Sequence, residues 1–202
     1  MNTASDREMT LNAVMNLARA CEYDAPHTHQ VVRLALCLFD QLYPLHQLEE
    51  TERDWLQYAG LLHDIGLVEG IQQHHKTGLN IILTTPLLAF DSKERLIIGS
   101  IVRYHRKALP SEKHDHFAAL EPEEQVVVTR LAAILRLADG LDAAHQSRVR
   151  DIKVKIKPDK VLLTCLVLQR PDEAERAAQK ADLFEMVYRT RLMVNWKRVK
   201  ED

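Results

Sequence analysis

The stretch Leu61-Leu62-His63-Asp64-Ile65-Gly66 decides how the chain is interpreted, because a histidine and an aspartate end an apolar helix there. Burying a bare carboxylate is costly unless a partner compensates its charge. A metal cation is one such partner, since imidazole and carboxylate together suit first-row metals. The alternative is an ordinary helix end, with His63 near the negative end of the helix dipole and Gly66 at the stop. The hexapeptide alone leaves both interpretations open.

Length and composition predict one ordinary domain, or one domain with a small appendage. The chain has 202 residues, of which 46% are hydrophobic, and this is enough for a real core. The formal net charge of −2 gives no strong field that would attract nucleic acid or an acidic membrane. Three widely spaced cysteines form no CxxC pair, and the N-terminus has no apolar signal core. We therefore expect reduced thiols and a cytoplasmic protein.

Apolar periodicity and capping residues predict helices over most of the chain. The expected helices run from Ser5 to about Ala20, from Pro26 to Leu42, from Thr51 to His63, from about residue 74 to 83, from Asp91 to residues 104–107, and from Pro122 to residues 139–142. The polar stretch 108–120 is expected to be a surface loop.

The pattern changes to period two after residue 148. Apolar residues alternate with lysines over 152–156, and this alternation is typical of a half-buried strand. A turn at Pro158-Asp159 and a second strand over Val161–Leu168 complete a predicted hairpin. An amphipathic helix is expected over 172–187, and a third strand over 192–196.

The predicted fold is mainly α, a helical bundle with a small C-terminal hairpin and helix. We expect a helical domain over residues 1–148 and a small α+β tail over residues 149–202. An isolated hairpin is marginal in water, so the tail is expected to pack on the helical body.

Five helical segments each present a histidine or an aspartate near an end or on a semi-buried face. In chain order these residues are His27, His63 with Asp64, His74 or His75, His105 and Asp139. Asp64 is a natural bridge between two metals, because one carboxylate has two oxygens. Arg136 lies three residues before Asp139 on the same helix face, so it can support the site or a bound anion.

This pattern resembles the HD superfamily of metal-dependent phosphohydrolases. Several stretches are similar to the C-terminal HD domain of the Ppx/GppA (exopolyphosphatase/guanosine pentaphosphatase) family, and the resemblance extends over nearly the whole chain, including the tail. These stretches are residues 27–31, 38–42, 62–66, 74–76, 102–107 and 135–142. The actin-like domains that carry that family's polyphosphate chemistry have no counterpart in this sequence, so exopolyphosphatase activity is not carried over.

The resemblance implies a set of metal ligands. The core ligands would be His27, His63, Asp64 and Asp139. HD members with two metals take further histidines from the next two helices, and His74 and His105 fit these roles. His74 fits better than His75 because it lies four residues before Gly78. Asp64 is also the predicted catalytic residue.

Cations beside the implied ligands are predicted to bind phosphate oxygens. They are Lys76, Arg106, Lys107 and Arg136. The alternative for these residues is solvated surface charge. Four other histidines are expected to be polar or core fillers, namely His46, His114, His116 and His145.

The function that the resemblance implies is a metal-dependent phosphohydrolase acting on a nucleotide or another phosphate ester. One or two divalent ions (Mn, Fe, Mg, Co or Ni) would activate water for attack on phosphorus. The alternative is a non-catalytic module that binds metal and nucleotide and has a regulatory role. A di-iron oxygenase is a third interpretation, which nothing in the sequence favours over hydrolysis. The expected partner is a small phosphorylated substrate or nucleotide, with no nucleic acid and no membrane; a homodimer stays open.

Overall fold

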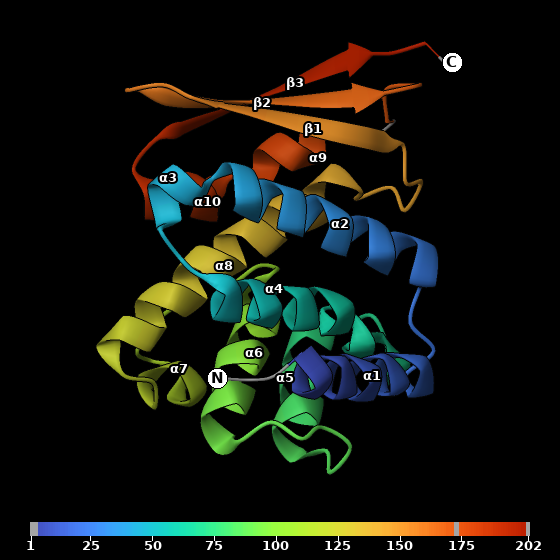
Figure 1. Ribbon diagram of the computed structural model, residues 1–202, viewed down its shortest axis with the longest axis vertical. Helices are drawn as coiled ribbons and strands as arrows, with labels where there is room; N and C mark the ends of the chain where they lie inside the picture. Colours follow the sequence, from blue (N-terminus) through green and yellow to red (C-terminus); the bar gives the residue numbers. More distant parts are fainter. Residues whose placement is uncertain (1–3, 172–173, 201–202) are drawn as a thin grey trace.

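The computed structural model describes residues 4–171 and 174–200, and it places a three-stranded sheet at one end of a body of helices (Figure 1). The predicted mainly α fold with a small C-terminal α+β part is confirmed. The body contains α1 (Ala4–Ala20), α2 (Ala25–Gln41), α3 (Tyr43–His46), α4 (Glu50–Leu62), the 3-10 helix η1 (Ile65–Glu69), α5 (His74–Thr84), α6 (Ser92–Tyr104), α7 (Asp115–Ala118) and α8 (Pro122–Leu141).

Local capping explains where several of these helices begin. Asp91 accepts a hydrogen bond from the backbone N–H of Glu94 at 2.8 Å, and the Glu94 side chain accepts one from the Asp91 N–H at 3.3 Å. The predicted start of α4 at Thr51 was wrong by one or two residues. The capping box there is formed by Glu49 and Glu52, since a glutamate can replace the usual short polar residue at the cap.

Helix α8 passes through the middle of the body and contacts α2, α4 and α6 (Figure 1). Every residue from Leu131 to Leu141 is buried, so this part of the helix is enclosed on all sides. A polar residue on such a segment is held inside the protein at a fixed position. Asp139 is one of these residues, and this is how the fold brings its carboxylate into the interior.

The predicted surface loop over 108–120 was wrong in part. It contains the short helix α7, and its apolar residues Phe117 and Leu120 are buried. Phe117 meets the ring of Tyr104 edge-on, with 5.6 Å between the ring centroids. One short turn presents too few apolar residues for a periodic pattern, so this helix could not be predicted from the sequence.

The tail forms a mixed sheet in the order β1-β2-β3. β1 (Val149–Ile156) pairs antiparallel with β2 (Lys160–Val167), which confirms the predicted hairpin. β3 (Arg191–Arg198) pairs parallel with β2 and confirms the third strand. Gln41 of α2 donates to the carbonyl of Ile152 at 3.0 Å, so the sheet is tied to the helical body. The division into domains at residue 148 stays a prediction.

The single helix predicted over 172–187 was wrong. The structure has two helices, α9 (Ala174–Gln179) and α10 (Asp182–Tyr188), and residues 172–173 lie outside the part that it describes. The backbone N–H of Ala181 donates to the carbonyl of Ala178, three residues back, at 3.2 Å. This tighter turn ends α9 and redirects the chain. Both helices contact α8 and β3, so they lie between the body and the sheet (Figure 1).

Among residues 4–171 and 174–200, no helix combines the length and the apolar character that crossing a membrane requires.

Gly66 allows η1 and α5 to pack with their backbones in contact. A Cβ at this position would lie 1.9 Å from the carbonyl oxygen of His74 and 2.6 Å from the backbone nitrogen of Gly78. Gly66→Ala is therefore expected to lower the free energy of unfolding by about 3 kcal/mol, measured by urea denaturation. Gly60→Ala is the matched control, because its nearest neighbour is a Val32 methyl group at 2.9 Å and not backbone. An equal loss in both variants would contradict this explanation.

Candidate metal centre

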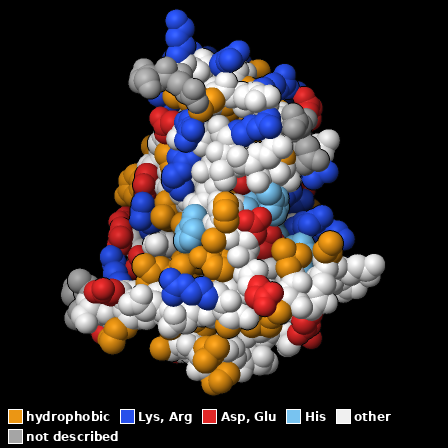
Figure 2. Space-filling model, turned by 90° about the vertical axis from the view of Figure 1, so that its right-hand side faces the viewer, with side chains coloured by type: hydrophobic (Ala, Val, Ile, Leu, Met, Phe, Trp, Pro, Cys, Tyr) orange, Lys and Arg blue, Asp and Glu red, His pale blue; other side chains and the backbone are white. Residues whose placement is uncertain are grey.

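The structure brings together all six residues predicted as metal ligands, although they come from six different elements. Each lies at or near a helix end, where a side chain can turn into the space between helices. His27 is in the first turn of α2, His63 directly follows α4, Asp64 caps η1, His74 begins α5, His105 directly follows α6, and Asp139 is in the last turn of α8. Figure 2 shows histidine side chains beside acidic ones in the middle of one face of the molecule.

The carboxylate of Asp64 faces two pairs of histidines, one with each oxygen. Its Oδ2 lies 3.4 Å from Nε2 of His63 and 4.0 Å from Nε2 of His27. Its Oδ1 lies 3.2 Å from Nε2 of His74 and 3.6 Å from Nε2 of His105. Two nitrogen or oxygen ligands that each bind one ion at ~2.1 Å are themselves ~3.0 to 3.4 Å apart at octahedral or tetrahedral angles. The two groups therefore have separations close to those of two metal subsites that share Asp64.

All four histidine rings are oriented by a hydrogen bond at Nδ1. The acceptors are Asp142 Oδ2 for His27 at 2.9 Å, Gly60 O for His63 at 2.8 Å, Ile71 O for His74 at 3.1 Å and Val102 O for His105 at 2.6 Å. Carbonyl and carboxylate oxygens accept, so each ring donates a hydrogen bond from Nδ1 and directs Nε2 inward. Histidines that bind metals are usually fixed in this way.

The inward Nε2 atoms lie close together in two pairs. Nε2 of His63 is 3.4 Å from Nε2 of His27, and Nε2 of His74 is 3.4 Å from Nε2 of His105. Two lone pairs at this distance repel unless a proton or a metal cation lies between them. The donor set therefore fits a cation at each pair.

Asp139 borders the group formed by His27, His63 and Asp64. Its Oδ1 lies 3.6 Å from Nε2 of His27, and its Oδ2 contacts the ammonium group of Lys180. The first candidate subsite has His27, His63 and Asp64, with Asp139 next to it. The second subsite has His74, His105 and the shared Asp64 carboxylate.

The buried ionisable groups of the cluster shift one another's pKa values. Burial disfavours a charged His27, but its hydrogen bonds to Asp139 and Asp142 outweigh this and raise its pKa to about 9. Burial, helped by the positive charge of His63, lowers the pKa of His105 to about 3. Burial also opposes charge on Asp64 and Asp139, yet the neighbouring histidines hold both pKa values far below the usual range. The carboxylates are therefore ionised, and a metal has to displace a proton at the first subsite.

Asp142 was missed by the sequence analysis as a partner of the site. It orients His27 from behind with Oδ2, while its Oδ1 accepts the backbone N–H of Ser147 at 2.7 Å. Asp142→Asn is expected to weaken metal binding at the first subsite about 10- to 100-fold, because an amide holds the ring less firmly and makes it less basic. Competition with a chelating indicator measures this change. Asp159→Asn, in the exposed turn of the hairpin, is the control; equal affinities in both variants would contradict the role.

The cluster opens to a cavity of about 330 Å³. Side chains on its wall include Asp64, Asp139, Arg106, His145, Arg176 and Lys180. His145, which the sequence predicts to be a filler, lies at this wall; its role stays a prediction. Its ring stacks on the ring of His27, with 3.6 Å between centroids and 10° between planes, and its Nδ1 is 2.8 Å from Asp24 Oδ2. His145 lies in a loop, so no periodic pattern placed it there.

The four predicted phosphate-binding cations lie in different places. Arg106 lines the cavity. Arg136 is buried and pairs with Asp182 of α10 at 2.6 Å, so its guanidinium is directed towards the tail. Lys76 and Lys107 are exposed and do not line this cavity. A role of these four residues in phosphate binding stays a prediction.

The choice between His74 and His75 favours His74, whose Nε2 faces Asp64. His75 is also buried, but its Nδ1 has no hydrogen-bond partner among the described residues. Burial, with the charge of Arg103, lowers the pKa of His75 to about 4, so this ring is neutral. His46 is a structural residue as predicted, since its Nε2 donates to Phe39 O at 2.7 Å.

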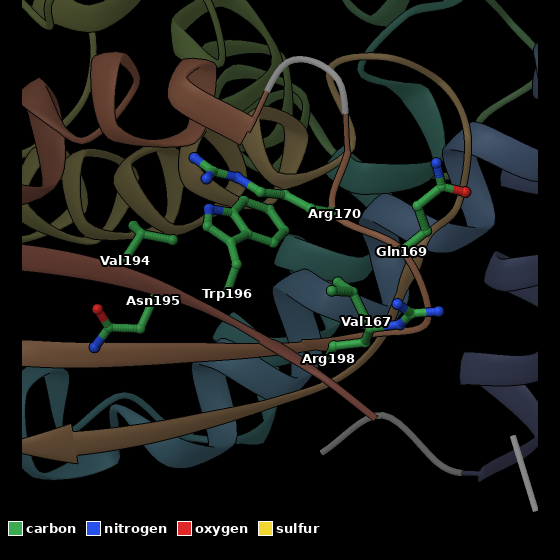
Figure 3. Close-up of a pocket in the computed structure, with 7 residues that line it drawn as sticks. All are labelled: Val167, Gln169, Arg170, Val194, Asn195, Trp196 and Arg198. Atoms are coloured by element: carbon green, nitrogen blue, oxygen red, sulfur yellow. The ribbon is translucent and has the colours of Figure 1, made fainter. Parts of the chain in front are cut away.

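A larger cavity of about 700 Å³ lies elsewhere, at the sheet. Figure 3 shows the residues that line it, with Trp196 on β3 and Arg170 just after β2. No residue of the His/Asp cluster belongs to its wall. Size alone therefore does not identify the functional site in this protein.

The helical body brings together a histidine, a His-Asp pair, two further histidines and an aspartate. This is the arrangement of an HD-like domain. Residues 7–187 match the family described as Ppx/GppA phosphatase, domain III, and the chain belongs to this family. The chain is also similar to the guanosine-5'-triphosphate,3'-diphosphate pyrophosphatase of Pseudoalteromonas atlantica (strain T6c / ATCC BAA-1087). The two are 28% identical over 116 residues, which is 57% of this chain and 22% of that protein.

Proposed function

We propose that the chain is an HD-type metal-dependent phosphohydrolase acting on a nucleotide or another phosphate ester. The observation that supports this proposal is the position of the Asp64 carboxylate, whose two oxygens each face two histidine Nε2 atoms. Imidazole and carboxylate ligands suit Mn, Fe, Mg, Co or Ni, and we propose one or two such ions per chain.

A divalent ion bound there supplies Lewis acidity and lowers the pKa of a bound water towards ~7. Asp64 is ionised and lies at the wall of the cavity, so its carboxylate can accept a hydrogen bond from the attacking water and orient it. Arg106 contributes positive charge to the same wall, where a phosphate oxygen gains charge during the reaction. Asp142 holds the His27 ring in place.

The second candidate is a non-catalytic module that binds metal and nucleotide and regulates a separate catalytic part. One observation favours it: the similar stretch covers only 22% of the pyrophosphatase from Pseudoalteromonas atlantica, and the family match is to a third domain. In this candidate the His/Asp cluster has the same ligands, but the cavity binds its ligand without turnover.

The experiment that separates the two candidates is a phosphate-release assay with the purified chain. The protein is loaded in turn with each of the five metals and tested on nucleotides and other phosphate esters. The proposal predicts release that disappears with a chelator and returns with added metal. Nucleotide binding by calorimetry without any release would contradict the proposal and support the regulatory module. Iron near two per chain with substrate-dependent oxygen uptake would instead indicate an oxygenase.

A further inference from the structure

Lys180 brings a positive charge from the tail to the mouth of the metal centre. It lies at the break between α9 and α10, and its ammonium group contacts Asp139 Oδ2. Gly140 on α8 makes the approach possible, since a Cβ there would lie 3.0 Å from both Cβ and Cδ of Lys180. The lysine stem therefore lies directly on the backbone of α8, and its head reaches the cavity.

The charges of the site change when it holds metal. In the structure, the ammonium of Lys180 is a counter-charge for Asp139. Divalent ions bound to the cluster would neutralise the carboxylates of Asp64 and Asp139 and compete with Lys180 for the latter. The cavity wall would then keep the positive charges of Lys180 and Arg106 beside the bound metal. A dianionic phosphate group is the ligand that balances such a wall.

The cavity offers room for a phosphate group beside the His/Asp cluster. Its volume of about 330 Å³ lies near the lower end of the roughly 300 to 1,000 Å³ of ligand pockets. His145, stacked on His27, occupies one side of this space.

We propose that Lys180 binds a phosphate group of the substrate. On binding, the ammonium of Lys180 moves its hydrogen bond from Asp139 Oδ2 to a phosphate oxygen. This inference rests on the proposed function, because it requires metal at the cluster. It assigns a substrate-binding role to the C-terminal tail.

Inorganic phosphate is the probe, titrated by calorimetry into the full chain after loading with metal. Lys180→Met is expected to weaken phosphate binding about 10- to 100-fold, the value of one charge-assisted hydrogen bond. Lys180→Arg keeps the charge and is expected to retain most of the affinity. Lys153→Met is the control, because Lys153 is exposed on β1 and does not line the cavity. Its affinity should equal that of the wild type.

Metal content is measured on the same samples and separates two kinds of failure. A wild-type protein that takes up no metal contradicts the proposed function, and this inference with it. A metal-loaded wild type whose phosphate affinity is unchanged by Lys180→Met contradicts the inference alone.

Discussion

Replacing Asp64 with asparagine is expected to abolish binding at both metal subsites. This carboxylate is the residue common to the two groups of ligands, and each of its oxygens faces one pair of histidines. An amide offers one oxygen and an NH₂ group, which cannot ligate, and it removes the negative charge that attracts the cations. Metal content measured by elemental analysis should fall to near zero. Phosphate release should fall by at least about 10³-fold.

The control for this variant is Asp159→Asn, which changes an exposed carboxylate in the turn between β1 and β2. It should keep the metal content and the activity of the wild type. Circular dichroism should show that Asp64→Asn keeps its helices, because the core of the bundle does not depend on this residue. A folded Asp64→Asn protein that retains its full metal content would contradict the proposed bridge.

His105→Ala is expected to remove one metal ion and leave the other. His105 belongs only to the second subsite, where its Nε2 faces Nε2 of His74 and Oδ1 of Asp64. The first subsite keeps His27 and His63, so elemental analysis after dialysis should show a fall from two ions per chain to one. His29→Ala is the matched control, because this exposed ring bonds Tyr23 and does not face the cluster. Loss of both ions in His105→Ala would contradict two separable subsites.

The helices of the body were predictable because the information for them is local. Apolar stripes, the capping pair at Asp91 and Glu94, and the proline at the start of α8 lie within a few residues of the elements they determine. The six proposed ligands were assigned through a family resemblance, and the structure places these residues close to one another. No local sequence pattern predicts that His27 and Asp139 lie within 3.6 Å of each other, since 112 positions separate them in the sequence.

The parts that could not be predicted depend on how distant segments pack. Arg136 lies on the same helix face as Asp139, but its guanidinium forms an ion pair with Asp182 of α10. Lys180 and His145 reach the cavity from a helix break and a loop, where no periodicity indicates which way a side chain points. The sequence predicts a hairpin, one helix and a third strand for the tail, but it does not predict that Lys180 of the tail lines the cavity.

Anomalous scattering from crystals of the metal-loaded protein tests the central claim most directly. Data collected at the absorption edge of bound manganese should show two peaks on either side of the Asp64 carboxylate. One peak should lie among His27, His63 and Asp139, and the other between His74 and His105. Crystals that contain manganese by fluorescence but show no peak at this cluster would contradict the account.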